Sequence, residues 1–196
     1  MKIFLHLKHW QLFILFFGIP VTLQVIMMFM AITAEDPFDF FRNMFFIFPI
    51  IMLLTIAVFF GWFYAMGTNL HKKLPPSVKM NLTKFKIFLA IPVIYLLIIS
   101  LSLFAFINVL FESEPRPQMI IGIIAIIVPF HLLSIFCIFY CIYFNAKALK
   151  AVELQRPVTF NDYIAEFFLL WFHVIGVWFI QPKINKLFAE ENASSI

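Results

Sequence analysis

Four long apolar runs constrain this chain more than any other feature. They cover residues 12–33, 44–66, 87–111 and 119–144, and none of them contains Asp, Glu, Lys or Arg. Because a helix rises about 1.5 Å per residue, each run can cross a hydrocarbon layer about 30 Å thick. Apolar residues make up 64% of the chain and charged residues 12%. A soluble domain of this size cannot bury so much apolar surface. The sequence therefore predicts an all-α integral membrane protein with four transmembrane helices.

The first run lies close to the N-terminus and has some features of a signal peptide. Lys2 and Lys8 precede it, as basic residues precede a secretory signal. The run from Leu12 to Ile32 is longer than the apolar region of a signal, and Ile32 stands where a cleavage site needs a small residue. We therefore expect a first transmembrane helix that is retained.

The polar segments between the runs are charged very unevenly. Ten cations lie in the N-terminal segment and in the loops 68–86 and 145–163: Lys2, Lys8, Lys72, Lys73, Lys79, Lys84, Lys86, Lys147, Lys150 and Arg156. The segments on the other side hold only Arg42 and Arg116, beside several acidic residues. Cytoplasmic loops are enriched in Lys and Arg. We therefore expect a bacterial inner-membrane protein with a cytoplasmic N-terminus and cytoplasmic polar loops.

A fifth apolar stretch, residues 164–180, is shorter than the other four. Lys183 and Lys186 follow it, and a full crossing would place them on the side that is otherwise poor in cations. A helix that enters the membrane, bends near Phe172–Gly176 and returns would keep the C-terminus cytoplasmic. We favour this short membrane-embedded or re-entrant helix over a fifth span, and we expect Pro182 to end it.

The chain also resembles itself at regular places. The matching pairs are 18–21 with 90–93, 49–55 with 129–134 and, as a shorter third copy, 78–89 with 158–169. Copies in the same orientation predict two parallel membrane hairpins related by an axis along the membrane normal. The third copy favours a spanning origin for 164–180, so the alternative of a fifth span stays open.

These patterns divide the chain into five parts. The parts are a first hairpin (1–67), a basic cytoplasmic loop (68–86), a second hairpin (87–144), a cytoplasmic helical extension (145–163) and a C-terminal membrane-associated helix with its tail (164–196). In the extension, good helix formers prolong the fourth helix up to Arg156-Pro157. Thr159 or Asn161 can then cap the next helix.

Few strongly polar side chains lie within the apolar runs. The candidates for an intramembrane polar site are Gln24, Asn108 and His131. Transporters and pumps mark their pathways with ionisable groups at mid-span, because such groups are costly in hydrocarbon. His131 also follows Pro129 by two residues and can bind a carbonyl that the proline leaves free. A structural role and a role in a transport path both remain open for it.

The sequence holds no catalytic or metal-binding motif. It lacks a Gly-rich phosphate loop, CxxCH, HExxH and a pair of carboxylates with catalytic spacing. Cys137 and Cys141 lie one helical turn apart, which suits buried thiols better than a disulfide. The longest polar loop is too short for a soluble catalytic domain. We therefore expect no catalytic residues, no metal and no cofactor.

The polar loops present a candidate face for a partner or for anionic lipid headgroups: Lys72, Lys73, Lys79, Lys84, Lys86, Lys147, Lys150 and Arg156. Each cation near the inner leaflet contributes about 1 kcal/mol of attraction. The same charges also fix the topology without binding anything specific. Trp171 and Trp178 are candidate interfacial anchors, because indole rings favour that depth.

Two C-terminal segments carry a resemblance to a known group of proteins. Ala146–Gln155 and Phe167–Asn185 are similar to segments of uncharacterised small polytopic inner-membrane proteins from Bacteroidetes-type bacteria. The related sequences have a proline where this chain has His173, so an essential role as a ligand is not expected for His173. The resemblance implies a polytopic topology and a bacterial source. It implies no activity.

The favoured interpretation is a non-enzymatic inner-membrane protein that acts through helix packing and its basic cytoplasmic face. It would be an accessory subunit of a membrane complex or an immunity protein, with the lipid bilayer, another membrane protein or a second copy as partner and no nucleic acid. A small permease for an apolar or amphipathic solute is the alternative. A lipid-modifying enzyme that uses Glu153, Asp162 and Glu166 ranks third.

Overall fold

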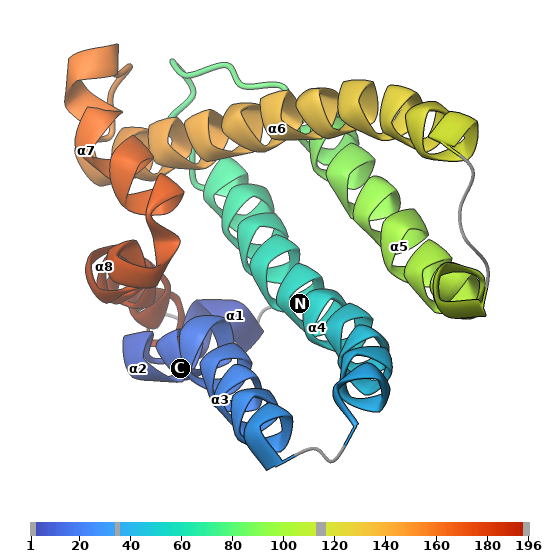
Figure 1. Cartoon of the computed structure of the whole chain (residues 1–196). Coiled ribbons are helices and arrows are strands. Elements are labelled where there is room, and N and C mark those ends of the chain that lie inside the picture. Colours follow the sequence, from blue (N-terminus) through green and yellow to red (C-terminus); the bar gives the residue numbers. More distant parts are fainter. Residues whose placement is uncertain (1–2, 34–35, 113–116, 194–196) are drawn as a thin grey trace.

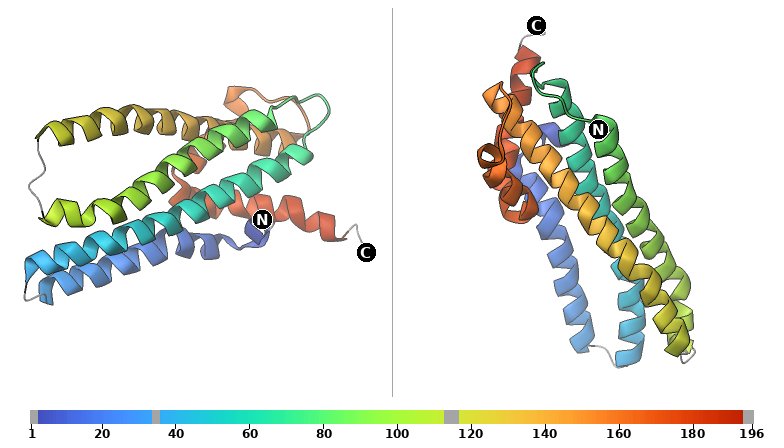
Figure 2. Two further views of the ribbon diagram at one scale, coloured as in Figure 1. Left: turned by 90° about the vertical axis from the view of Figure 1, so that its right-hand side faces the viewer. Right: turned by 90° about the horizontal axis from the view of Figure 1, so that it is seen from above.

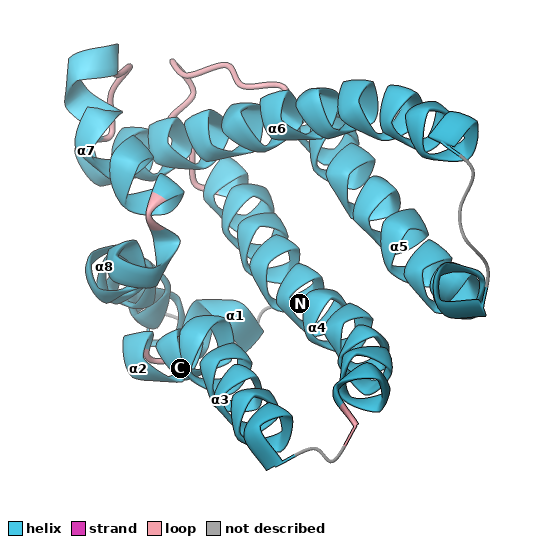
Figure 3. Cartoon of the chain, viewed as in Figure 1, coloured by secondary structure: helices cyan, strands magenta, loops and turns pink. Residues whose placement is uncertain are grey.

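The computed structural model describes residues 3–33, 36–112 and 117–193, with side chains described except at 37–46, 104–112, 117, 119–120 and 190–193. Every regular element in that part of the chain is helical (Figure 3). The helices are α1 (Ile3–His6), α2 (His9–Phe13), the π-helical turn η1 (Ile14–Gly18), α3 (Ile19–Thr33), α4 (Pro37–Lys72), α5 (Leu82–Glu112), α6 (Pro117–Leu154), α7 (Phe160–Trp171) and α8 (His173–Ala193).

Four helical stretches are long and apolar enough to cross a membrane. They are His9–Thr33, which joins α2, η1 and α3, then Ile47–Lys72 in α4, Leu82–Leu103 in α5 and Ile121–Leu154 in α6. This confirms the predicted all-helical chain with four membrane-length helices. The helices continue beyond the apolar runs, so the connection between α4 and α5 is only residues 73–81.

The helices gather at one end of the molecule. α4 packs against α3, α5 and α6, while α7 packs on α6 and α8 returns from α7 to pack on α1 and α2 (Figure 1). α7, α8 and the connection 73–81 lie together at the same end of the long helices (Figure 2). We call this the packed end.

Side-chain burial is concentrated at the packed end. Large side chains from α4, α5, α6, α7 and α8 are fully buried there: Trp62, Phe63, Met66, Leu70, Phe85, Phe144, Leu149, Leu170 and Ile180. In contrast, every residue from 121 to 133 of α6 is exposed. These residues cover about three and a half turns, so no face of this part of α6 is buried, although its residues contact Tyr95 of α5.

A glycine allows α4, α5 and α6 to meet closely at the packed end. A Cβ on Gly67 would lie 2.5 Å from Cζ of Phe85 and 2.8 Å from Oδ1 of Asn145. Phe85 in turn stacks on Phe144, with ring centroids 4.4 Å apart. No larger residue fits at 67 without moving a buried ring.

Prolines lie inside the long helices and do not end them. Pro37 opens α4 and Pro49 follows it by twelve residues, just as Pro117 opens α6 and Pro129 follows it by twelve residues. Pro182 was predicted to end the last helix, and this was wrong because α8 continues to Ala193. Buried side chains on both sides of Pro182 hold the helix together despite the lost hydrogen bond.

Candidate functional site

A buried carboxylate joins three helices at the packed end. Glu166 of α7 is 3% exposed, and its Oε1 accepts hydrogen bonds from Nζ of Lys150 at 3.1 Å and from Nζ of Lys183 at 2.8 Å. Glu153 completes the group, 3.1 Å from Lys150 and 3.4 Å from Lys183. These four residues, which we call the ion cluster, carry two positive and two negative charges and tie α6, α7 and α8 together.

Two opposing effects set the pKa of Glu166. Burial raises the pKa of this carboxyl group, but the hydrogen bonds from Lys183 and Lys150 outweigh burial and hold the pKa below its usual range. Glu166 is therefore ionised at neutral pH. Its Oε2 is buried and has no hydrogen-bond partner among the described residues. The ion cluster as a whole has no net charge, and its members bind one another. Such a cluster suits a structural role better than proton transfer, which needs a pKa near the working pH.

The connection between α6 and α7 is closed by its own polar contacts. The backbone N–H of Thr159 donates to Oδ2 of Asp162 at 2.7 Å, and Nη2 of Arg156 donates to Oδ1 of Asp162 at 2.9 Å. These hydrogen bonds lower the pKa of Asp162 to about 2. Thr159 is the N-cap of α7, as one of the two sequence alternatives predicted. Gln155 directly follows the last residue of α6 and has a φ of 51°, which stops the helix there.

Amide side chains of α8 bind the N-terminal helices. Nε2 of Gln181 donates to the carbonyl oxygens of Phe4 and Leu7, at 2.9 and 2.8 Å, and Oε1 of Gln181 accepts from Nε1 of Trp62 at 2.9 Å. Asn185 adds a bond to the Leu7 carbonyl at 3.1 Å. The helix breaks between α1 and α2, so these carbonyls lack partners within a helix. Gln181 is fully buried and satisfies them from another part of the chain.

The C-terminal apolar stretch forms two helices that meet at a sharp bend. Phe172 separates α7 from α8, with φ of −87° and ψ of 52°. A Cβ on Gly176 would clash with the carbonyl oxygen of Leu169. Only glycine lets the first turn of α8 approach the last turn of α7 this closely.

The candidate headgroup face divides according to what each cation contacts. Lys150 and Arg156 bind carboxylates of the chain itself, and Lys73 donates to a carbonyl of α8 at 2.8 Å. Lys84 and Lys147 contact aromatic rings. The remaining members are exposed: Lys72, Lys79 and Lys86.

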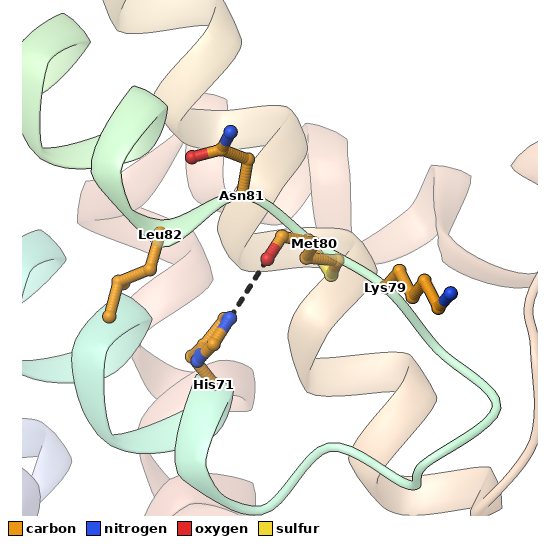
Figure 4. Close-up of a pocket in the computed structure, with 5 residues that line it drawn as sticks. All are labelled: His71, Lys79, Met80, Asn81 and Leu82. Atoms are coloured by element: carbon orange, nitrogen blue, oxygen red, sulfur yellow. Dashed lines mark hydrogen bonds between the residues drawn. The ribbon is translucent and has the colours of Figure 1, made fainter.

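An open pocket lies beside the connection between α4 and α5 (Figure 4). Its lining residues are His71, Lys79, Met80, Asn81 and Leu82. Nε2 of His71 donates to the carbonyl oxygen of Met80 at 2.9 Å, and Oδ1 of Asn81 accepts from the N–H of Lys84 at 2.9 Å at the start of α5. These polar groups shape the connection, so they are not free to bind a ligand.

The structure does not bring the intramembrane candidates together. Gln24 is exposed on α3 and His131 is exposed on α6, and these helices lie on opposite sides of α4 (Figures 1 and 2). Nδ1 of His131 lies 3.4 Å from the hydroxyl of Tyr95 on α5. The side chain of Asn108 lies outside the described residues. His131 is thus not placed to bind a carbonyl freed by Pro129 in the described contacts.

The two tryptophans of the C-terminal segment lie on different helices. Trp171 ends α7 and packs edge-on against Phe139 of α6, with centroids 4.9 Å apart. Trp178 of α8 lies 4.7 Å from the ring of His9 on α2. Both indoles stay nearly half exposed, so each has one face on the protein and one face outside it.

No group of three His, Cys, Asp or Glu side chains is close enough to hold a metal ion within the described ranges. Cys137 and Cys141 are buried and free. Comparisons with protein-family models, curated proteins and solved structures gave no match to this chain. Its function is therefore argued from its own residues.

Sequence reasoning did not single out the polar residues of α8. Lys183 served there only as a charge that argues against a fifth span, and Gln181 and Asn185 were given no binding role. A signal was present, because Gln181 and Asn185 are four residues apart and so share one face of a helix. That face also carries the buried Val177 and Ile184, which indicates a packed stripe.

Proposed function

We propose that this chain is a non-enzymatic accessory subunit of a membrane complex. Its four long helices hold it in the bilayer, and the exposed sides of α3 and α6 pack against transmembrane helices of a different membrane protein. The observation that carries the proposal is that Gln24 and His131, the strongly polar side chains at mid-span, are both exposed.

Exposure of such groups to lipid is costly. An amide or imidazole without a partner in hydrocarbon loses its hydrogen bonds to water at a cost of roughly 2–7 kcal/mol. Gln24 has no hydrogen-bond partner among the described residues, and His131 has the Tyr95 hydroxyl at 3.4 Å, which is long for a hydrogen bond. A partner helix that carries polar side chains at this depth would satisfy both groups.

The distribution of packing supports the same proposal. The packed end is closed by the ion cluster and by Gln181, whereas every residue from 121 to 133 of α6 stays exposed. Only 11% of the most apolar part of the first and fourth spans is buried inside the chain. Helices of other subunits cover such surfaces in membrane complexes.

The proposal includes a topology in a bacterial inner membrane. The ten cations listed above support a cytoplasmic N-terminus and a cytoplasmic packed end. α7 and α8 then form a re-entrant or interfacial pair with a cytoplasmic C-terminus. Two contacts support this: Lys183 of α8 binds Glu166 of α7, and Lys73 of the α4–α5 connection donates to a carbonyl of α8.

The internal repeat belongs to the proposal as well. The equal spacing of Pro37 and Pro49 in α4 and of Pro117 and Pro129 in α6 supports two hairpins of common origin. Membership of the small inner-membrane family that Ala146–Gln155 resembles is part of the same proposal. Internal repeats are common in polytopic membrane proteins, and many transporter folds are built from them.

Native mass spectrometry of the tagged chain, extracted from its own membranes in mild detergent, tests the proposal. We expect a second membrane protein at fixed stoichiometry. A double variant, Gln24→Leu with His131→Leu, should lose that protein while the tagged chain stays folded. The matched control is Thr22→Val on α3, because the Thr22 hydroxyl already donates to the carbonyl of Gly18 at 2.8 Å.

Three results would overturn the proposal. A wild-type chain that runs as a monomer, or only with copies of itself, is not an accessory subunit. Retention of the partner by the double variant would show that Gln24 and His131 are not its contacts. Loss of solute uptake by the double variant, without a protein partner, would favour the permease alternative.

A further inference from the structure

The cations of the packed end are not equivalent. Three of them are neutralised inside the chain: Lys150 and Lys183 by Glu166, and Arg156 by Asp162. Lys84 and Lys147 have no carboxylate partner among the described residues. These two lysines are therefore available to an anion from outside the chain.

Lys84 is held over aromatic rings of two helices. Its Nζ lies 5.1 Å from the ring centroid of Tyr140 on α6 and 5.4 Å from that of Phe88 on α5. The rings of Phe88 and Tyr140 are themselves 4.6 Å apart. Cation–π contact limits where the ammonium group goes without neutralising it, so its charge remains available.

Lys147, on α6, is also held by an aromatic side chain. Its Nζ donates to the hydroxyl of Tyr143 at 3.1 Å. The rings of Tyr143 and Tyr140 are 6.0 Å apart, and Tyr163 of α7 packs edge-on against Tyr143 at 5.8 Å. Lys84, Tyr140, Tyr143 and Lys147 thus form a continuous row across α5 and α6, which we call the lysine–tyrosine row.

The depth of this row matches a headgroup layer. The third apolar run begins at Ile87, three residues after Lys84, and the fourth ends at Phe144, three residues before Lys147. Three residues of helix rise about 4.5 Å, so both ammonium groups lie just outside the hydrocarbon. Tyrosine rings favour this same depth. Below the row, the Phe88 ring lies 6.1 Å from the ring of Phe136, which is largely exposed.

We propose that the lysine–tyrosine row binds the phosphate headgroup of an anionic glycerophospholipid, whose acyl chains lie along Phe88 and Phe136. This inference goes beyond the subunit proposal and shares with it only the placement of the long helices in the bilayer. A lipid fits better than a free phosphate ion, because the apolar wall continues directly below the cations.

Native mass spectrometry with added lipid tests the inference. The purified chain is titrated with phosphatidylglycerol and with phosphatidylcholine of the same acyl chains, and the bound lipid is counted. We expect wild type to prefer phosphatidylglycerol. Lys84→Gln with Lys147→Gln should weaken its binding roughly 30-fold, which corresponds to about 1 kcal/mol for each of two cations. Lys84→Arg with Lys147→Arg should keep most of the binding.

The matched control removes two other cations of the same end. Lys72→Gln with Lys86→Gln changes the net charge equally, and both residues are exposed. Equal weakening by this control would overturn the inference, since binding would then follow net charge alone. Displacement of the lipid by millimolar inorganic phosphate would overturn the assignment to a lipid. A wild-type chain without lipid preference refutes this inference alone, whereas a missing protein partner refutes the subunit proposal alone.

Discussion

Nζ of Lys183 lies 2.8 Å from Oε1 of Glu166, although the bend at Phe172 separates their helices. Lys150 reaches the same oxygen from α6. One carboxylate therefore fixes the positions of three helices at the end where the chain is best packed. The C-terminal helices are thereby bound to the long helices and cannot be a loose tail.

Replacement of Glu166 by Gln should lower stability. The variant keeps the shape of the side chain but leaves Lys150 and Lys183 with a weaker acceptor, so we expect a loss of about 1–3 kcal/mol. Thermal unfolding in mild detergent, followed by circular dichroism, measures the loss. Glu153→Gln is the control, because this carboxylate is more exposed and should cost less than about 1 kcal/mol. Equal losses in both variants would contradict a special role for Glu166.

Acid should loosen the packed end in a defined pH range. The pKa of Glu166 lies below its usual value, and that of Asp162 is lowered from 3.8 to about 2. A carboxylate whose pKa is depressed in the folded state stabilises the fold above its unfolded pKa, and this contribution is lost as the pH falls through the folded pKa. We therefore expect these two carboxylates to contribute no pH dependence near neutral pH and to cause a decline of the unfolding temperature below about pH 4.5.

The decline can be assigned with single variants. Asp162→Asn should remove the part of the pH dependence between about pH 4 and pH 2. Glu166→Gln should remove the part that begins at higher pH. A wild-type profile that stays flat down to pH 2 would show that neither carboxylate is linked to folding.

Gln181→Met should detach the N-terminal helices. The apolar side chain would leave the N–H of Trp62 and the carbonyl of Phe4 without a partner, and the Leu7 carbonyl would keep only its bond from Asn185. We expect a cost of about 2–4 kcal/mol. Faster proteolysis near residues 3–13 would report the detachment directly. Gln24→Met is the control, since Gln24 is exposed on α3 and has no hydrogen-bond partner among the described residues. A protected N-terminus in Gln181→Met would contradict this role.

Two glycines should respond to alanine in opposite ways. A Cβ at Gly67 meets Phe85 at 2.5 Å, whereas a Cβ at Gly122 has no atom within 4 Å. We expect Gly67→Ala to cost about 1–3 kcal/mol by overpacking. Gly122→Ala should be neutral or stabilise the helix by up to about 1 kcal/mol. Thermal unfolding compares the two variants, and similar values would show that α4 does not need close approach at Gly67.

The membrane-length helices were predictable because their signal is local. Each apolar run exceeds the thickness of a bilayer, and no charge interrupts it. The N-cap at Thr159 was predictable for the same reason, since the cap and its partner Asp162 are three residues apart. The end of α8 was not predictable, because distant packing overrides the local effect of Pro182.

The candidate sites were predictable only as residue types. The sequence placed Gln24 and His131 at mid-span, but it did not show that they lie on opposite sides of α4. It grouped eight cations into one face, whereas contacts with Glu153, Glu166 and Asp162 separate them into paired and available ones. Charge pairing depends on which helices meet, and apolar runs of similar composition do not specify their neighbours.

The sequence by itself determined that the chain is helical and has four membrane-length helices, because hydrophobic length acts along one helix at a time. Only the tertiary structure decided that Glu166 is buried, that Gln181 binds the break between α1 and α2, and that Lys84 and Lys147 share a row with two tyrosines. Each of these depends on side chains from different helices that meet at one end. The residue spacing along a single helix does not determine how that helix packs against its neighbours.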